Sequence, residues 1–330
     1  MKKILPFILI FILSALLMSG CNHVVENQAF GTYFSIKING KEATSKGKYV
    51  ESLILEMDGL LSTSNPNSDV SKINNSKANV PIKVSGVTAS VFRFSKELYK
   101  ETNGAYNPAV FPLVELWNFA PTNFVGIEKS IPTQQEIENT LELCSLDYFI
   151  LDENNSTITK TKEGAKLDFG AITKGYAAES AYTILEHLDS ATIDIGRTIK
   201  SVGEINVMVA NPRKGDFVAK ATINNKCIAT SGDYERYYEI DGKRYHHIIG
   251  LDGYPAGTND KNPIISATII GDNGSLCDAF STAAMVLGYN GIKPIIEKNG
   301  YSALLLTESG YYIVGNNDFT IIDETRTKLN

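Results

Sequence analysis

One stretch near the end of the chain, Asp272–Gly288, limits the possible folds more than any other. Its apolar residues recur at helical spacing, a polar turn precedes them and a glycine follows, so the stretch predicts a buried helix. Asp278 and Thr282 depart from the apolar pattern, and their i, i+4 spacing places them on one helix face. The small alanines beside them would let a ligand or another segment approach the backbone closely.

The carboxylate of Asp278 has two interpretations. One carboxylate and one hydroxyl are too few ligands for calcium or zinc, but they suit magnesium, which keeps several waters and takes other oxygens from substrate phosphates. Ser275 followed by Asp278 is also a capping-box pattern, because a carboxylate near a helix N-terminus interacts favourably with the helix dipole. The spacing alone leaves both interpretations open.

Length and charge narrow the class of protein. The 330 residues are 43% hydrophobic with a net charge of -6, which fits one large domain or two closely packed ones. An acidic chain with scattered lysines has no basic stripe for a phosphate backbone, so we expect no nucleic-acid partner. The cysteines show no paired spacing of a zinc or redox motif, and Cys144, Cys227 and Cys277 are expected to be buried free thiols.

The N-terminus carries the clearest targeting signal. A basic start precedes an apolar run over residues 4–18 that is short for a bilayer span, and Ser19-Gly20-Cys21 follows. This order predicts a signal peptide over residues 1–20. Small residues directly before a cysteine are similar to a bacterial lipobox, in which Cys21 becomes the lipid-modified start of a mature domain spanning 21–330. The protein would then be lipid-anchored on the extracytoplasmic face of the cell membrane; cleavage as an ordinary signal peptide is the alternative.

Helical and strand-like patterns are mixed along the rest of the chain, with no internal repeat and no low-complexity linker. The mixture predicts an α+β protein. We expect helices near residues 48–61, 70–73, 86–102, 132–143 and 291–298, strands near 30–38, 191–195, 204–210, 219–223, 227–230, 303–307, 310–314 and 319–322, and hairpins at 150–160 and 236–249.

Three further features are candidates for a site. Gly104–Phe119 is rich in apolar and aromatic residues but contains two prolines, so it is either a pocket wall or a hydrophobic connection packed on the core. Leu167–Glu179 predicts a strand-to-helix turn, where backbone N–H groups favour phosphate, although most glycine turns simply join two elements. His246 and His247 are adjacent in a predicted strand and must point to opposite sides.

Taken together, these stretches resemble the ApbE family of FAD:protein FMN transferases, which are flavin-attaching lipoproteins. The match runs in consistent order over nearly the whole mature chain. The stretches that carry it are Phe30-Gly31-Thr32, Leu61–Ser64, Ser68–Asn74, Gly104–Phe119, Leu167–Ala178, Thr230–Tyr234, His247–Ile249 and Asp278–Gly288.

The resemblance implies an ApbE-like, T-fold-related architecture, in which FAD lies in a cleft between two intimate lobes of mixed or antiparallel sheets with helices. It implies that the diphosphate binds Mg²⁺, held by the carbonyl of Ala171 and the side chains of Asp278 and Thr282, with Ser281 adjacent. It also implies flavin contacts at Phe30, Ser64, Ala105, Tyr106, Asn107, Asp168, Lys174, His247 and Ile248.

The implied reaction transfers FMN from FAD to a threonine of an extracytoplasmic acceptor redox protein and releases AMP. Phosphoryl transfer mostly requires positioning and neutralisation of charge, which magnesium on Asp278 and the ammonium of Lys174 would supply. His247 is the candidate general base, because an imidazole titrates near neutral pH.

Three positions depart from the family pattern. Asn107 stands where aspartate is usual, and Gly196-Arg197-Thr198 replaces a Gly-Gly-Asn or Gly-Gly-Asp turn, where an arginine could fill space or strain the backbone. Gly250–Pro255 replaces the usual Asp-Pro-x-Thr-Gly after the candidate base. These departures motivate an alternative, a lipoprotein that binds FAD or splits it to FMN and AMP without transfer to protein. A surface lipoprotein that merely shares the fold is a third possibility.

Overall fold

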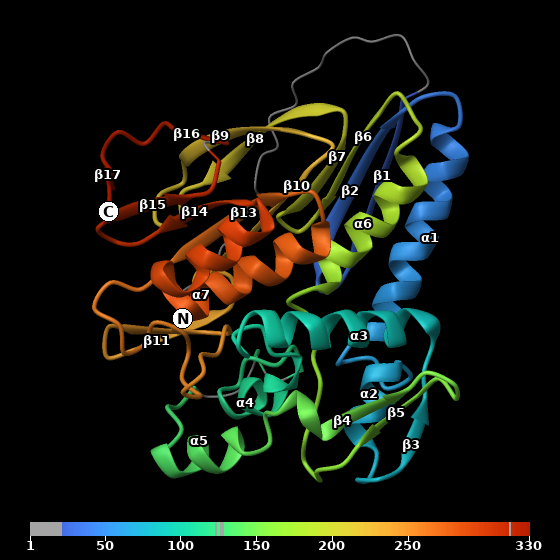
Figure 1. The fold of residues 1–330 in the computed structure, drawn as a ribbon, viewed down its shortest axis with the longest axis vertical. Helices are drawn as coiled ribbons and strands as arrows, with labels where there is room; N and C mark the ends of the chain where they lie inside the picture. The colour runs from blue at the N-terminus through green and yellow to red at the C-terminus, as the bar shows by residue number, and fades with distance from the viewer. Residues whose placement is uncertain (1–21, 123, 126–128, 317) are drawn as a thin grey trace, which may run out of the picture.

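A nine-stranded sheet forms the centre of the molecule in the computed structural model, which describes residues 22–122, 124–125, 129–316 and 318–330 (Figure 1). Neighbouring strands are antiparallel, except that β15 and β17 are parallel. In spatial order the strands are β1 (Asn22–Ala29), β2 (Thr32–Asn39), β6 (Ser190–Ile195), β7 (Thr198–Val202), β10 (Cys227–Gly232), β13 (Ser266–Gly271), β14 (Ser302–Leu306), β15 (Gly310–Val314) and β17 (Thr327–Lys328).

The predicted signal peptide at residues 1–20 and the predicted lipidation site at Cys21 lie outside the described residues. Within the described part of the chain, the helices are all too short or too polar to cross a membrane.

Three helices cover one face of the large sheet: α1 (Ala43–Leu61), α6 (Thr173–Leu185) and α7 (Gly274–Asn299). Alternation along the strands explains how the two faces are filled. In β13, for example, Ala267 and Ile269 pack in the cluster under α7, whereas Ile270 belongs to the cluster on the opposite face. Figure 1 shows α6 and α7 crossing this face, with α1 beside them.

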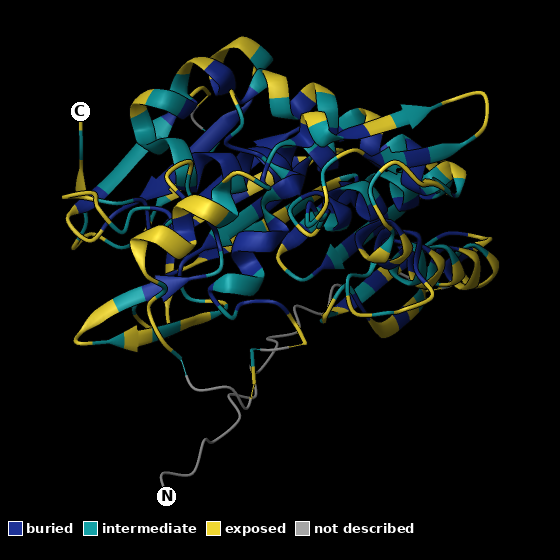
Figure 2. Ribbon diagram, turned by 90° about the horizontal axis from the view of Figure 1, so that it is seen from below, coloured by how far each residue is buried: buried dark blue, intermediate teal, exposed yellow. Residues whose placement is uncertain are grey.

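A smaller antiparallel sheet packs on the opposite face through apolar residues such as Ile228 and Leu304. Its spatial order is β16-β9-β8, with bounds β8 (Glu204–Ala210), β9 (Phe217–Asn224) and β16 (Phe319–Ile321). The large sheet is therefore buried on both faces over its central strands, and Figure 2 shows the buried residues concentrated in the middle of the molecule.

A second part of the chain lies below the large sheet in the view of Figure 1. It contains α2 (Asp69–Asn75), α3 (Gly86–Glu101), η1 (Pro108–Val110), α4 (Phe111–Leu116), α5 (Gln134–Leu141), η2 (Leu146–Tyr148) and the sheet β3 (Pro81–Lys83), β5 (Thr157–Lys160), β4 (Phe149–Asp152). The hairpin β11 (Tyr237–Ile240) and β12 (Lys243–His246) stacks Tyr245 on Trp117 of this part, with ring centroids 5.6 Å apart.

The α+β prediction is confirmed, and most predicted elements are present. Three differences have clear causes. The strand predicted over residues 30–38 begins only at Thr32. Phe30 and Gly31 instead make a two-residue turn with φ of 53° and 71°. Residues 167–169 do not pair in a sheet. The strands β7 and β13 were not predicted, and β13 is buried at every residue, so its sequence lacks the alternation that identifies a half-buried strand.

The predicted glycine stop at Gly288 is confirmed, although the chain resumes a helix directly afterwards. Gly288 has φ 65° and ψ -176°, which breaks α7 into two helical segments and agrees with the separate helix predicted near residues 291–298. A left-handed φ with extended ψ is accessible essentially only to glycine.

The N-terminal turns of α6 and α7 meet through two glycines. A Cβ atom on Gly175 would overlap the carbonyl oxygen of Gly274 and lie 2.8 Å from Cβ of Asp278, and a Cβ on Gly274 would lie 2.6 Å from the Gly175 oxygen. Only hydrogen at both positions allows this approach, which brings Asp278 to the start of α6.

We therefore expect Gly175→Ala to lower the free energy of unfolding by about 1–3 kcal/mol, the usual cost of overpacking a closed contact. Gly59→Ala is the matched control, since Gly59 is also helical but a Cβ there meets no atom within 4 Å. The control should be neutral or stabilising by about 0.5–1 kcal/mol. Urea unfolding of both variants measures the difference, and equal stabilities would contradict the close helix contact.

Candidate active site

A cavity of about 940 Å³ lies where the two parts of the chain meet. Its walls come from the β1–β2 turn, the end of α1, the segment after α3, the turn before α6, the end of β10 and the segment after β12. This volume is at the upper end of the range for small-molecule and cofactor sites, about 300–1,000 Å³.

Most of the residues predicted from the sequence as site residues line this cavity. They are Phe30, Ser64, Ala105, Asn107, Asp168, Ala171, Lys174, His247, Ile248 and Thr282. Tyr106, Ser281 and Asp278 do not appear among the lining residues, and each is almost completely buried.

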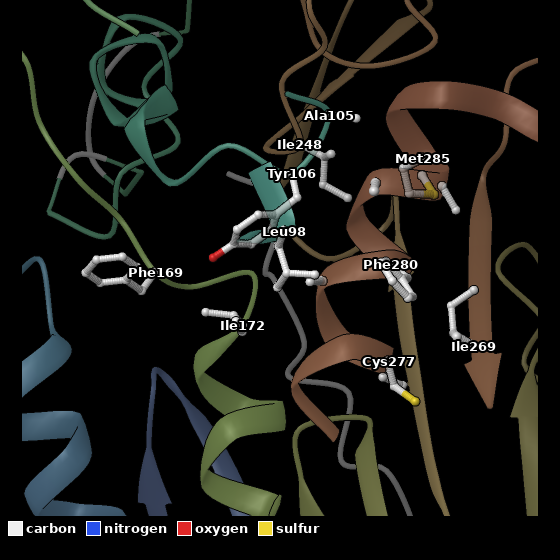
Figure 3. Packing of buried hydrophobic residues seen from close by; sticks show 14 of the residues in the cluster. Leu98, Ala105, Tyr106, Phe169, Ile172, Ile248, Ile269, Cys277, Phe280 and Met285 are labelled. Atoms are coloured by element: carbon white, nitrogen blue, oxygen red, sulfur yellow. The ribbon is translucent and has the colours of Figure 1, made fainter. Parts of the chain in front are cut away.

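Tyr106 lies behind the cavity wall, in the apolar core. Its hydroxyl lies 2.8 Å from Oγ of Ser95, and burial raises the pKa of this hydroxyl. Figure 3 shows the ring among apolar side chains that include Leu98 and Ile172. The segment Gly104–Phe119 thus combines both sequence interpretations: Asn107 faces the cavity, while Tyr106 and Trp117 pack in the core.

Asp278 takes no part in capping its own helix, so the interpretation of Ser275 and Asp278 as a capping box is wrong. Asn273 is the N-cap of α7, and its side chain accepts a hydrogen bond from the N–H of Leu276 at 3.1 Å. The carboxylate of Asp278 instead accepts a hydrogen bond from the N–H of Gly175 at 3.0 Å, in the first turn of α6. It therefore satisfies a free N–H group at the start of another helix and interacts with the positive end of that helix dipole.

Lys174 places a cation beside this carboxylate. Its Nζ lies 3.1 Å from Oδ1 of Asp278 and 3.3 Å from Oδ2, and it also donates to the carbonyl oxygen of Gly170 at 3.3 Å. Carboxylate and carbonyl oxygens are the ligand types that a hard cation prefers. Thr282 lies one helical turn after Asp278 and lines the cavity, where its Oγ1 lies 3.2 Å from Oγ of Ser231.

Ser281 has a supporting position. Its hydroxyl donates to the carbonyl oxygen of Asp278 at 2.8 Å and lies 2.7 Å from Oγ of Ser231. Among the described residues, no group of three or more His, Cys, Asp or Glu side chains could hold a metal ion. A cation at this site would therefore take most of its ligands from hydroxyl, backbone, water and substrate oxygens.

The two adjacent histidines line different cavities, although only His246 belongs to the strand that was predicted to contain both. His246 ends β12 and lines a second cavity of about 250 Å³, and its Nε2 lies 2.9 Å from the carbonyl oxygen of Ala256. His247 follows and lines the large cavity, where its buried Nδ1 has no hydrogen-bond partner among the described residues. Burial, reinforced by the nearby Arg236, holds the pKa of His247 well below its usual value, so the imidazole is neutral.

The altered loop after His247 is a compact turn. The N–H of Gly250 donates to the carbonyl of Tyr254 at 2.7 Å, and Trp117 Nε1 donates to the carbonyl of Gly253 at 2.9 Å. This loop is anchored on the aromatic core, and Gly250 and Leu251 remain at the cavity.

Arg197 occupies a strained position in the wall. It follows Gly196 in the two-residue turn between β6 and β7, with φ of 49° for Gly196 and 74° for Arg197. A side chain at such a left-handed φ costs roughly 1–2 kcal/mol relative to glycine. The arginine therefore strains this turn, and it also lines the cavity.

Sequence reasoning missed Asp58, which also lines the cavity and whose Oδ1 accepts a hydrogen bond from the N–H of Phe30 at 2.8 Å. A signal was present, because Asp58 lies four residues after Ile54 and interrupts the apolar stripe of its helix. Arg236 was also missed. It donates to the carbonyl of Phe119 at 3.0 Å and carries no comparable signal in a surface hairpin.

The fold and the cavity define a mixed α+β protein whose site has both polar and apolar walls and a volume typical of a large cofactor site. The model of the ApbE family matches residues 30–305. The chain belongs to the ApbE family.

Several relatives extend this similarity over most of the chain. The chain is 30% identical over 263 residues to the FAD:protein FMN transferase of Klebsiella pneumoniae, covering 78% of this chain and 80% of that protein. It is 28% identical over 353 aligned positions to the Haemophilus influenzae protein of the same name, covering 99% and 100%. The crystal structure of the ApbE protein of Thermotoga maritima matches with a TM-score of 0.80 and 28% identity, covering 90% of this chain and 97% of that one.

The neutral state of the two histidines predicts how stability depends on pH. Burial lowers the pKa of both His246 and His247 below 6.5 in the folded chain, so below that pH the unfolded chain binds protons that the folded chain does not. Stability is then complete above pH 6.5 and is lost as the pH falls, by up to about 1.4 kcal/mol per pH unit for each histidine.

Urea unfolding between pH 7.5 and 5.5 should show this loss, and His247→Gln should reduce its slope. His187→Gln is the control, because that histidine is exposed on the surface. Identical slopes for the wild type and His247→Gln would show that His247 is not held neutral by the fold.

Proposed function

We propose that this protein is a Mg²⁺-dependent FAD:protein FMN transferase, which moves FMN from FAD to a threonine of an acceptor redox protein and releases AMP. The supporting observation is the convergence of Lys174, Thr282 and His247 on one dinucleotide-sized cavity, in a chain of the ApbE family. Relatives that carry this activity in their names match nearly the full length.

The cavity accounts for binding of FAD between the two parts of the chain. Phe30 and Ile248 offer apolar contacts for the flavin, and Asp58, Asn107 and Asp168 offer polar ones. Asp278, Thr282 and the carbonyl of Ala171 would hold Mg²⁺, which when bound supplies positive charge to the diphosphate. Lys174 would then give up its contact with Asp278 and bind a phosphate oxygen.

The chemical step needs one proton acceptor. The threonine oxygen forms a bond to the phosphorus on the FMN side, the bond from that phosphorus to the bridging oxygen breaks, and AMP leaves with this oxygen. The lowered pKa of His247 keeps its imidazole neutral, and its Nδ1 has no hydrogen-bond partner among the described residues. The ring would accept the hydroxyl proton once the bound substrates bring that hydroxyl to it. Closure of the site by the acceptor would exclude water, which is the competing nucleophile.

A second candidate function, cleavage of FAD to FMN and AMP without transfer to protein, is favoured by the anchored loop after His247. Trp117 fixes that loop through Gly253, and Gly250 and Leu251 of the same loop line the cavity. A loop that cannot open would exclude a protein acceptor more strongly than it excludes water.

One assay separates the candidates. Protein lacking residues 1–21 is incubated with FAD, Mg²⁺ and a protein that carries the threonine acceptor motif of ApbE-family transferases. The products measured are AMP and a fluorescent flavin band that survives SDS. We expect both products from the wild type. AMP without a band would favour cleavage alone, and the absence of both would contradict any enzymatic function.

Asp278→Ala should lower both products at least 100-fold, because a charged ligand and the partner of Lys174 are lost together. Asp272→Ala is the matched control, since this exposed carboxylate lies just before the same helix. Full turnover by Asp278→Ala would contradict the proposed magnesium site.

We further propose that the mature protein is anchored to the cell membrane by lipid on Cys21. The described chain enters β1 at Asn22, directly after this residue. Cys21→Ser, expressed with the native N-terminus, should move the protein from the membrane fraction to the soluble fraction and leave its FAD binding unchanged. Retention of Cys21→Ser in washed membranes would contradict the lipid anchor.

A further inference from the structure

The β6–β7 turn carries an arginine where its backbone favours glycine. Both residues of the turn, Gly196 and Arg197, have positive φ, the geometry of a type I′ turn for which Asn-Gly or Gly-Gly is preferred. Strain of this kind persists where the surrounding structure or the function requires the residue. The side chain of Arg197 enters the cavity, so the strain coincides with the active site.

The guanidinium of Arg197 has weak partners in this structure. It lies 4.7 Å from the centre of the Tyr234 ring, and its Nη1 lies 3.5 Å from Oε1 of Glu235. The side chains of Arg197 and Glu235 are 45% and 36% exposed. An ion pair that is so open to solvent contributes little and exchanges readily, so Arg197 can change partners when an anion enters.

One side-chain contact and one backbone hydrogen bond fix this turn beside the proposed cation site. The residue after Arg197, Thr198, places Oγ1 3.5 Å from Oδ1 of Asp278. The carbonyl of Arg197 accepts a hydrogen bond from the N–H of Thr230 at 3.3 Å, and the next residue, Ser231, lies against Thr282. Arg197 is therefore tied from both sides to the part of the cavity wall that lies beside Asp278 and Thr282.

The charges of the cavity wall favour a further cation when a diphosphate binds. Lys174 is paired with Asp278 at 3.1 Å, and Arg236, which also lines the cavity, donates to the carbonyl of Phe119 at 3.0 Å. Asp58, Asp168 and Glu235 add negative charge to the walls of the same cavity. A guanidinium binds phosphate oxygens through two parallel hydrogen bonds, which an ammonium cannot do.

We propose that Arg197 is a phosphate-binding residue of this chain, which leaves Glu235 and Tyr234 to grip the diphosphate of the bound dinucleotide. The identity of the dinucleotide as FAD rests on the proposed function. The contact between Arg197 and a phosphate requires only a phosphate-bearing nucleotide in the cavity, so binding measurements alone can test it.

The test titrates riboflavin, FMN and ADP separately into the wild type, Arg197→Gly and Arg197→Lys, with Mg²⁺ present, and follows flavin fluorescence or heat. Arg197→Gly should weaken FMN and ADP binding at least tenfold and leave riboflavin binding within twofold. Arg197→Lys should recover part of the loss. Because glycine suits this turn, the melting temperature of Arg197→Gly should stay the same or rise, which separates lost binding from unfolding.

Glu235→Gln gives an opposite expectation. Loss of the Arg197–Glu235 ion pair should free the guanidinium and tighten FMN binding by about twofold to fivefold. In the Arg197→Gly background this gain should vanish, and a double-mutant cycle measures the difference. A gain that persists there would contradict the exchange of partners, because it would reflect only the removal of a negative charge.

Two outcomes would overturn the proposal. Equal weakening of riboflavin and FMN would make Arg197 a structural residue, and unchanged or tighter FMN binding to Arg197→Gly would show that the arginine obstructs the cavity. Failure of the proposed function is recognised separately, by the absence of AMP and flavinylated product in the wild type.

Discussion

The junction between the N-terminal turns of α6 and α7 is the constraint on which the site depends. Gly175 and Gly274 let the two backbones touch, and each helix start is satisfied by a carboxylate from the other. Asp278 of α7 accepts from Gly175 N–H, and Glu179 of α6 accepts from Gly274 N–H at 2.7 Å. Lys200, buried in β7, balances Glu179 at 3.1 Å. The reciprocal pairing holds Asp278 in place before any ligand arrives.

This junction links the large sheet to the residues around the cavity. β7 carries Lys200 beneath the helix starts and Thr198 against Asp278, and it begins directly after the turn that presents Arg197. The other part of the chain supplies Asn107 and the wall around it. The cavity is thus an outcome of tertiary packing, and a substitution at the helix contact should disturb the cavity and the stability together.

Sequence reasoning was most successful where a pattern has one physical meaning. The periodic helices α1 and α3 and the Asp-Gly hairpin are examples, since their burial is one-sided and their turn chemistry is specific. It failed at β13, whose burial on both faces removes the alternation. The spacing correctly singled out Asp278 as a residue that its own apolar helix does not require. It could not show that this carboxylate caps a different helix, because that contact arises only in the folded chain. Most site residues came from the family resemblance, which does not distinguish a wall residue from Tyr106 behind it.

The position of β1 has a consequence for partner choice. This edge strand begins at Asn22 and has eight residues, and the turn at its far end, Phe30-Gly31, lines the cavity. A strand rises about 3.3 Å per residue, so an acylated Cys21 would keep that wall within roughly 26 Å of the bilayer surface. Because β1 would follow the lipidated residue directly, the proposed enzyme would act only close to the bilayer surface. Its acceptor threonines would then have to lie on proteins that are themselves bound to the membrane.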